Sequence, residues 1–319
     1  MSGARIRAAV AEDEAGLTEL WATAFAPPLT PDQWLIDSER LAHTLVAEDD
    51  EGLCGSIYGL PKRLRESEGG IAEVRAIGSV AVAERARGQG LARRLVAATL
   101  ELGRDADWAL LFTGTPEVYR SSGFETFSMP RTLAGRWEAR AMAAPEVAPV
   151  VTEVVGPGSF DTVSFDTVNF DTVRTVYERS REGRVVLAPV RSERDWAMAE
   201  VRMSGATLYR RVEGSAVLGY AIAEHRGEVG SLLESAVLPD ADDPAGVHRA
   251  LLAAVAADWA SASVRSCDLA VPALPEDERV MRDFAPEAVR QDDRTGMIRP
   301  LRRAPRLHGI RHFTAGDYF

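Results

Sequence analysis

The stretch Val80-Ala81-Val82-Ala83-Glu84-Arg85-Ala86-Arg87-Gly88-Gln89-Gly90-Leu91-Ala92-Arg93 decides the fold of this chain. It begins at the end of an apolar segment, residues 71–82, whose composition is typical of a β-strand. It leads into residues 91–102, where apolar side chains recur at helical spacing. The basic loop between them contains Gly88 and Gly90, which let the backbone approach a phosphate closely. A loop of this kind before a helix N-terminus predicts a site for a phosphate-bearing ligand, although a tight strand-to-helix turn would use the same glycines.

Strand and helix patterns alternate on both sides of this stretch. Gly78 interrupts the apolar segment that precedes the loop, and an internal glycine of this kind predicts a β-bulge or a close approach of another backbone. In the first 130 residues we expect strands at 6–10, 45–47, 54–58, 71–82, 108–113 and 124–127, and helices at 11–25, 91–102 and 116–122.

The second half of the chain repeats this order. We expect strands at 208–211, 216–223 and 230–237, a helix at 248–260, and a strand at 266–271. Three strands, a helix and a strand also follow one another from residue 45 to residue 113. The two halves are therefore interpreted as diverged copies of one unit.

A change in composition separates the halves. Residues 139–158 are rich in Ala, Pro, Val and Gly, and the sequence Phe-Asp-Thr-Val then occurs three times, beginning at Phe160, Phe165 and Phe170. A period of five fits neither a helix nor a strand, so the repeat is interpreted as a lengthened linker or helix entry. The expected organisation is a first domain at 1–140, a linker at 141–175 and a second domain at 176–319.

The motif around the loop resembles a known family. Val80-Ala81-Val82, a four-residue spacer and Arg87-Gly88-Gln89-Gly90-Leu91-Ala92 resemble the acetyl-CoA signature of GNAT N-acetyltransferases, Gln/Arg-x-x-Gly-x-Gly/Ala. Arg85, Gly88 and Gly90 fit the same pattern two residues earlier, but the later register has the usual distance from Val82. The resemblance covers about residues 4–135. It implies an α/β (α+β) chain of two tandem GNAT folds, each a mixed, mostly antiparallel sheet flanked by helices.

The resemblance also implies how acetyl-CoA, as cosubstrate, would bind. Its pantetheine arm would pair with the backbone of the strand before the loop, and its diphosphate would lie on the N–H groups of the loop and the first helical turn. The implied binding residues are Val80, Ala81, Val82, Arg87, Gly88, Gln89, Gly90, Leu91, Ala92 and Arg93.

Catalytic candidates come from the same comparison. Val118-Tyr119-Arg120-Ser121-Ser122-Gly123-Phe124 resembles the family's helix after the fifth strand, where a tyrosine often protonates the departing thiolate. Tyr119 is therefore the expected general acid; a buried packing tyrosine is the alternative. For the general base two candidates stay open. The first is Glu73, which lies on the strand that leads to the loop. The second is the C-terminal carboxylate of Phe319, because the aromatic rings of Tyr318 and Phe319 predict a docked tail. In the similar enhanced intracellular survival (Eis) acetyltransferases, which carry a further sterol-carrier-like domain, a C-terminal phenylalanine carboxylate enters the active site.

The second half departs from the signature before its helix. The sequence Pro239-Asp240-Ala241-Asp242-Asp243-Pro244-Ala245-Gly246 has three aspartates, which would repel a diphosphate, and two prolines, which lack N–H donors. We therefore expect a degenerate GNAT-like domain that has lost acetyl-CoA binding. Such a domain would wall the substrate cleft or mediate assembly.

Composition limits the remaining possibilities. The net charge of −11 disfavours a nucleic-acid partner and suits a cationic acceptor. No apolar run is long enough for a membrane helix, and the N-terminus lacks the layout of a signal peptide, so we expect a cytoplasmic protein without a membrane partner. Cys54 and Cys267 are expected to be buried free thiols, and no His/Cys spacing suggests a metal. A homo-oligomer is left open.

The predicted function is transfer of an acetyl group from acetyl-CoA directly to a primary amine of a small molecule or peptide. One alternative is a mycothiol-synthase-like enzyme, also a tandem GNAT protein, although in that family the second domain carries the intact site. Another is a non-catalytic acetyl-CoA-binding regulator, and a third is a scaffold. The intact loop and Tyr119 favour the enzyme.

Overall fold

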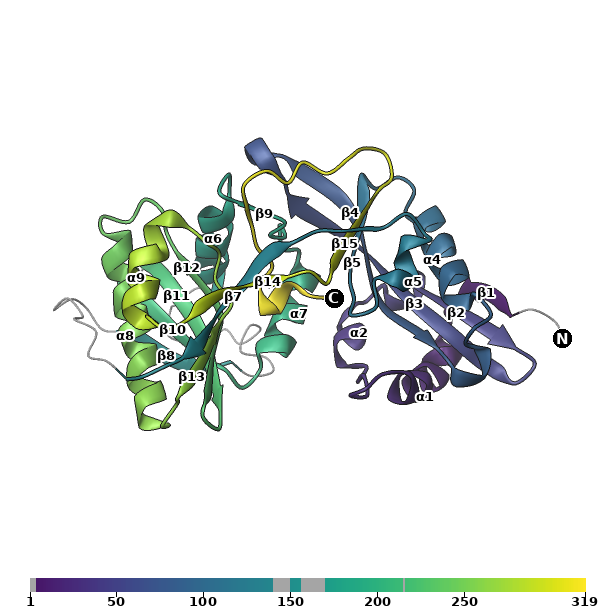
Figure 1. The fold of residues 1–319 in the computed structure, drawn as a ribbon, viewed down its shortest axis with the longest axis horizontal. Helices are drawn as coiled ribbons and strands as arrows, with labels where there is room; N and C mark the ends of the chain where they lie inside the picture. Colours follow the sequence, from purple (N-terminus) through teal and green to yellow (C-terminus); the bar gives the residue numbers. More distant parts are fainter. Residues whose placement is uncertain (1–3, 140–149, 156–169, 215) are drawn as a thin grey trace.

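The computed structural model describes residues 4–139, 150–155, 170–214 and 216–319. These residues form two bodies, each built on a twisted sheet with helices packed against it (Figure 1). Most neighbouring strands are antiparallel in both sheets, as expected for two tandem GNAT folds. The mixed α/β class is therefore confirmed.

The first sheet contains seven strands. Their order is β1 (Arg5–Ala8), β2 (Thr44–Asp49), β3 (Gly52–Arg65), β4 (Ile71–Val82), β5 (Trp108–Phe112), β15 (Gly296–Pro300) and β6 (Glu125–Thr126). Its helices are α1 (Glu14–Ala24), α2 (Asp32–Ile36), α3 (Arg40–His43), α4 (Leu91–Leu102) and α5 (Glu117–Arg120). Because side chains alternate along a strand, α4 packs on the face that carries Leu45 and α1 on the face that carries Val46.

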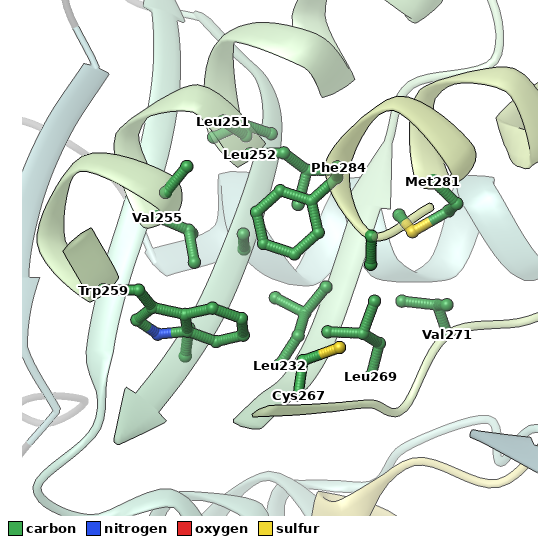
Figure 2. Close-up of a cluster of buried hydrophobic side chains, with 14 of the residues drawn as sticks. Leu232, Leu251, Leu252, Val255, Trp259, Cys267, Leu269, Val271, Met281 and Phe284 are labelled. Atoms are coloured by element: carbon green, nitrogen blue, oxygen red, sulfur yellow. The ribbon is translucent and has the colours of Figure 1, made fainter. Parts of the chain in front are cut away.

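The second sheet also contains seven strands. Their order is β14 (Val289–Asp293), β7 (Met129–Arg136), β13 (Ser266–Leu269), β12 (Val229–Val237), β11 (Ala216–Arg226), β10 (Thr207–Glu213) and β8 (Val150–Val154). The accompanying helices are α6 (Phe170–Arg181), α7 (Glu193–Met203), α8 (Pro244–Ser261) and α9 (Glu278–Phe284). Figure 2 shows part of the core, in which Trp259 of α8 and Phe284 of α9 pack over strand residues such as Leu232.

The two bodies exchange strands. β7 follows β6 directly in the sequence, yet it pairs with β13 and β14 in the second sheet. In return β15 enters the first sheet between β5 and β6. Each sheet therefore includes a strand from the other side of the expected boundary at residue 140. For the other elements the division into 1–140, 141–175 and 176–319 stays a proposal.

Several sequence expectations match the elements closely. β4 and α4 have the expected bounds, and the order of β10, β11, β12, α8 and β13 repeats that of β2, β3, β4, α4 and β5. Cys54 and Cys267 are free and buried, as expected. The third Phe-Asp-Thr-Val copy begins α6 at Phe170, whereas the first two copies lie outside the described residues. The strands β7, β14 and β15 were not predicted, because their sequences are short and do not indicate which strands they pair with.

The strand exchange predicts that residues 1–140 will not form a stable domain alone. Without β15, β5 loses an antiparallel neighbour and β6 loses its pairing. We expect the fragment to lack a cooperative thermal transition by circular dichroism, and co-expression with residues 141–319 to restore one. A fragment that unfolds cooperatively and binds acetyl-CoA would show that the exchanged strand is dispensable.

Candidate active site

The candidate site begins where β4 separates from β5. The two strands pair in parallel from Val74 and Trp108 to Ile77 and Leu111, and β4 then continues to Val82 without β5. A bulge in the β3–β4 ladder lies at the same place, and Ser79 there has a φ of 50°. Gly78 thus lies at a bulge, as expected. Residues 78–82 of β4, called the β4 opening below, have no partner on β5 and could pair with a ligand that continues the sheet.

The glycine loop follows β4 after a short 3-10 turn. Gly88 and Gly90 have φ values of 73° and 72°, a left-handed conformation that favours glycine. The Arg87 guanidinium donates to the Val82 carbonyl at 3.2 Å, and the Gln89 amide donates to the Arg85 carbonyl at 3.2 Å, so both side chains brace the loop.

Loop and helix leave a row of backbone donors open. The first helical hydrogen bond of α4 runs from Arg94 N–H to the Gly90 carbonyl. In the described part of the chain no acceptor binds the N–H groups of residues 88–93, which is the arrangement an anion requires. A cavity lined by the loop, Val82 and α5 residues Glu117 and Val118 lies beside them.

The surrounding arginines differ in their partners. Arg85 forms an ion pair with Asp49 at 3.0 Å, so its charge is compensated. Arg87 and Arg93 are exposed and form no ion pair with a described residue. The positive charge available to a diphosphate therefore comes from Arg87 and Arg93, as in the version of the motif that starts at Arg87.

Tyr119 of α5 lies beside the β4 opening. It is 9 % exposed and packs with Ile77, Leu111 and Phe124 in one cluster, against which Val80 also packs. Burial raises the pKa of its phenol, which is therefore protonated at neutral pH. Its hydroxyl has no hydrogen-bond partner among the described residues, so its proton is available to a bound molecule.

Phe319 reaches the same strand from the other end of the chain. A Cβ placed on Gly78 would lie 2.8 Å from the main-chain oxygen of Phe319, so the two backbones touch at the bulge. The aromatic ring packs against Phe112, with 5.9 Å between centroids. The tail is therefore docked, and Phe319 lies against Gly78, next to Ile77, which shares a hydrophobic cluster with Tyr119.

Glu73 is not brought to this site. It lies before the strands separate, five residues from Gly78 and roughly 17 Å away along the strand. Its carboxylate is exposed and lies 3.4 Å from the Arg63 guanidinium. The geometry thus favours Phe319 over Glu73 as the partner of Tyr119.

Comparison with known families agrees with this geometry. Residues 5–127 match a family model described as an acetyltransferase (GNAT) domain. The first domain is a GNAT domain. The chain is accordingly an acyltransferase, and GNAT domains in general transfer an acyl group from an acyl-CoA to an acceptor.

Solved structures extend the similarity in fold to both halves. A probable N-acyltransferase from Enterococcus faecalis has a TM-score of 0.70 at 17% identity, covering 95% of this chain and 73% of that one. A GCN5-related N-acetyltransferase from Kribbella flavida has a TM-score of 0.68 at 18% identity, covering 94% and 71%. Eis1 from Mycobacterium abscessus has a TM-score of 0.61 at 16% identity, covering 93% and 73%. No curated protein matches the sequence.

A small second pocket, about 30 Å³ in volume, is lined by Phe319, by side chains of the first domain and by Met198 of α7. It is lined by Trp21, Leu29, Thr30, Gln33, Trp34, Tyr58, Ser79, Met198 and Phe319. Both indole N–H groups are bonded within the protein, Trp21 to Ser56 at 2.9 Å and Trp34 to Thr44 at 2.8 Å. Local sequence patterns do not predict this pocket as a whole, because its residues come from distant segments and resemble ordinary core.

A buried carboxylate lies behind this pocket. Asp37 accepts hydrogen bonds from Tyr58 at 2.7 Å and from His43 at 2.5 Å. Burial alone would raise the pKa of Asp37, but these bonds hold it below its usual value. The polar edge of Tyr58 is thereby fixed, and its ring is held as a wall of the pocket.

In the corresponding loop of the second domain, Asp240 and Asp243 are both engaged within the protein. Asp243 caps α8 by accepting from Gly246 N–H at 2.9 Å, and Asp240 pairs with Arg179 at 2.6 Å. Where β12 separates from β13, Arg181 donates to the Ser235 carbonyl at 2.9 Å. These contacts agree with the expected loss of acetyl-CoA binding, which stays a prediction.

Two further features concern the described residues only. No helix there is long and apolar enough to cross a membrane. No group of three or more His, Cys, Asp or Glu side chains there could hold a metal ion.

The loop predicts the effect of Gly90→Asp. A side chain at φ 72° is strained, and a carboxylate beside the open N–H groups would repel a diphosphate, so we expect acetyl-CoA affinity to fall on the order of tenfold or more. Gly183→Asp is the matched control, because Gly183 has a φ of 66° with open space around it but lies in the second domain. Titration calorimetry should give one site per chain, weakened only in Gly90→Asp; equal affinities in the two variants would contradict the loop's role.

Proposed function

We propose that the chain transfers the acetyl group of acetyl-CoA directly to a primary amine of a small molecule or peptide. The observation that carries the proposal is the position of two groups at the β4 opening. The neutral phenol of Tyr119 lies on one side of it, and the main-chain end of Phe319 lies against Gly78. The general acid and general base of an acetyl transfer would occupy such positions.

Acetyl-CoA would bind along the β4 opening and the loop. The backbone of Val80 and Val82 would pair with the pantetheine amides, since β5 leaves that edge of β4 open. The diphosphate would accept from the N–H groups of residues 88–93, with Arg87 and Arg93 supplying positive charge. This geometry would place the thioester near Gly78 and Tyr119.

The acceptor would enter through the aromatic pocket beside Phe319. In the described part of the chain the terminal carboxylate of Phe319 forms no ion pair, so it is free to attract an ammonium group and then take its proton. The amine nitrogen attacks the thioester carbonyl, the C–S bond breaks, and the thiolate receives a proton from Tyr119. The second proton that the nitrogen loses as the amide forms returns to the Tyr119 phenolate. The net charge of −11 favours the approach of a cationic amine.

Tyr119→Phe tests the general acid. The ring and its packing are kept while the proton donor is lost, so we expect kcat to fall by about 10²–10⁴-fold with little change in melting temperature. Tyr209→Phe serves as control, because it removes the hydroxyl of a buried tyrosine, bonded to Asp258 at 2.5 Å, in the second domain. Release of free thiol from acetyl-CoA with a panel of amines is the assay. Near-normal turnover in Tyr119→Phe would reduce Tyr119 to a packing residue.

A C-terminal amide tests the terminal carboxylate. Converting the carboxylate of Phe319 to an amide by protein ligation removes the charge and the base but keeps the ring. We expect turnover to fall by about 10²-fold or more, because a positioned base typically contributes that much. Acetyl-CoA affinity should not change, since the loop is untouched. An amidated protein as active as the native chain would exclude the carboxylate as base.

A further inference from the structure

The C-terminal tail contacts both domains before its last residue reaches Gly78. β16 (Ile310–Arg311) pairs with β9 (Val185–Val186), and His312 N–H donates to the Val186 carbonyl at 3.1 Å. A 3-10 turn at Ala315–Asp317 then packs on α7, where a Cβ on Gly316 would lie 3.0 Å from the Ala199 side chain. The end of the chain lies between the two bodies (Figure 1).

The turn is held by a buried cluster of charged and polar groups, called the Arg191 cluster and formed by Arg191, Glu234, Thr314 and Asp317. Nε of Arg191 donates to Asp317 at 2.9 Å, and Nη2 donates to Glu234 at 2.5 Å and to Thr314 at 3.1 Å. Thr314 Oγ1 also donates to Glu234 at 2.8 Å. The side chains of Arg191, Glu234 and Asp317 are at most 1% exposed.

The tail supplies two of the hydrogen-bond acceptors of the buried Arg191 guanidinium, Asp317 and Thr314, while Glu234 supplies its other carboxylate. Burial opposes ionisation of Glu234, but the Arg191 guanidinium outweighs burial and holds the pKa of Glu234 below its usual value. Asp317 supplies the second carboxylate to Arg191. Undocking would leave Nε of the buried Arg191 without this acceptor, which is unfavourable.

The first domain contributes a second contact to the same residue. Lys62 of β3 donates to Asp195 of α7 at 2.9 Å and to the Asp317 carbonyl at 3.4 Å. Its ammonium also lies 5.7 Å from the centre of the Phe319 ring. Asp317 is thus held through its side chain by one domain and through its backbone by the other.

The cluster lies at the second domain's counterpart of the β4 opening. β12 carries a bulge between Leu232 and Glu234 and pairs with β13 only as far as Leu232. β4 shows the same two features at Gly78. The tail therefore occupies the position in the second domain that the proposed thioester site has in the first.

We propose that Arg191 is a positioning residue, which fixes Asp317 in the second domain's strand opening so that Phe319 reaches Gly78 in the first. Only two residues follow Asp317, a reach of roughly 7 Å, so its anchorage determines where the chain end lies. The second domain then has a role in catalysis without binding acetyl-CoA. This inference rests on the proposed function of Phe319.

Paired insertions test the anchor. One glycine inserted between Asp317 and Tyr318 keeps every group of the Arg191 cluster but displaces Phe319 by up to about 3.5 Å. One glycine inserted between His308 and Gly309 lengthens an exposed turn before β16. The contact of Asp317 with Arg191 would still fix the position of the two residues that follow it. We expect turnover to fall by about 10²-fold in the first variant and to stay near the native value in the second. Equal turnover in the two variants would overturn the proposal.

Asp317→Asn tests the same anchor without relying on turnover. The matched control is Asp240→Asn, which removes the carboxylate of the exposed pair with Arg179. A carboxypeptidase that removes aromatic C-terminal residues should release Phe319 on the order of tenfold faster or more from Asp317→Asn than from the native chain or the control. Acetyl-CoA affinity should be equal in all three.

The two readouts separate this inference from the proposed function. If the C-terminal amide is fully active but Asp317→Asn speeds release of Phe319, the tail is anchored as proposed and only the role of the carboxylate is wrong. If release is equally fast in the native chain and in Asp317→Asn, Arg191 does not anchor the tail and the inference is wrong, whatever the amide shows.

Discussion

The structure depends on the ion pairs that Arg191 forms in the interior of the second domain. A buried guanidinium needs acceptors for its N–H groups, and leaving a buried donor unsatisfied typically costs about 1–3 kcal/mol. Here one of the partners, Asp317, belongs to a tail that ends in the first domain. The hydrogen bonds that satisfy this guanidinium therefore also set the relation between the tail and β4.

The two domains use the same architectural feature in different ways. β4 and β12 each carry a bulge and separate from a parallel neighbour at the same relative place. In the first domain the edge beyond the bulge is open toward a loop whose N–H groups have no described acceptor. In the second, Arg181 and the tail fill the opening, and Asp243 caps the helix beyond it. One opening thus has no described strand along its free edge, and the other is filled by the protein's own chain.

Local patterns in the sequence predicted the parts of the site that lie on one continuous segment. The bounds of β4 and α4 and the place of Gly88 and Gly90 in the loop between them follow from spacing and composition over residues 71–102. Contacts between distant segments could not be predicted in this way: Arg191 and Asp317 are 126 positions apart, and the exchanged strand β15 carries no mark of its partner. The aromatic chain end did predict a docked tail. The sequence left Glu73 open as the other candidate base, and only the strand register, which puts Glu73 five residues before Gly78, separates the two candidates.

The strand exchange has a consequence for biosynthesis. The first sheet needs β15, which ends at Pro300, whereas β6 is complete at Thr126. At the usual elongation rates of about 5–20 residues per second, the ribosome takes roughly 10–35 s to make the intervening chain. During that interval β5 presents an unpaired edge, and nascent chains on one polysome could associate through it. A protein of this topology would therefore be expected to rely on chaperones during translation more than a GNAT domain whose strands are contiguous.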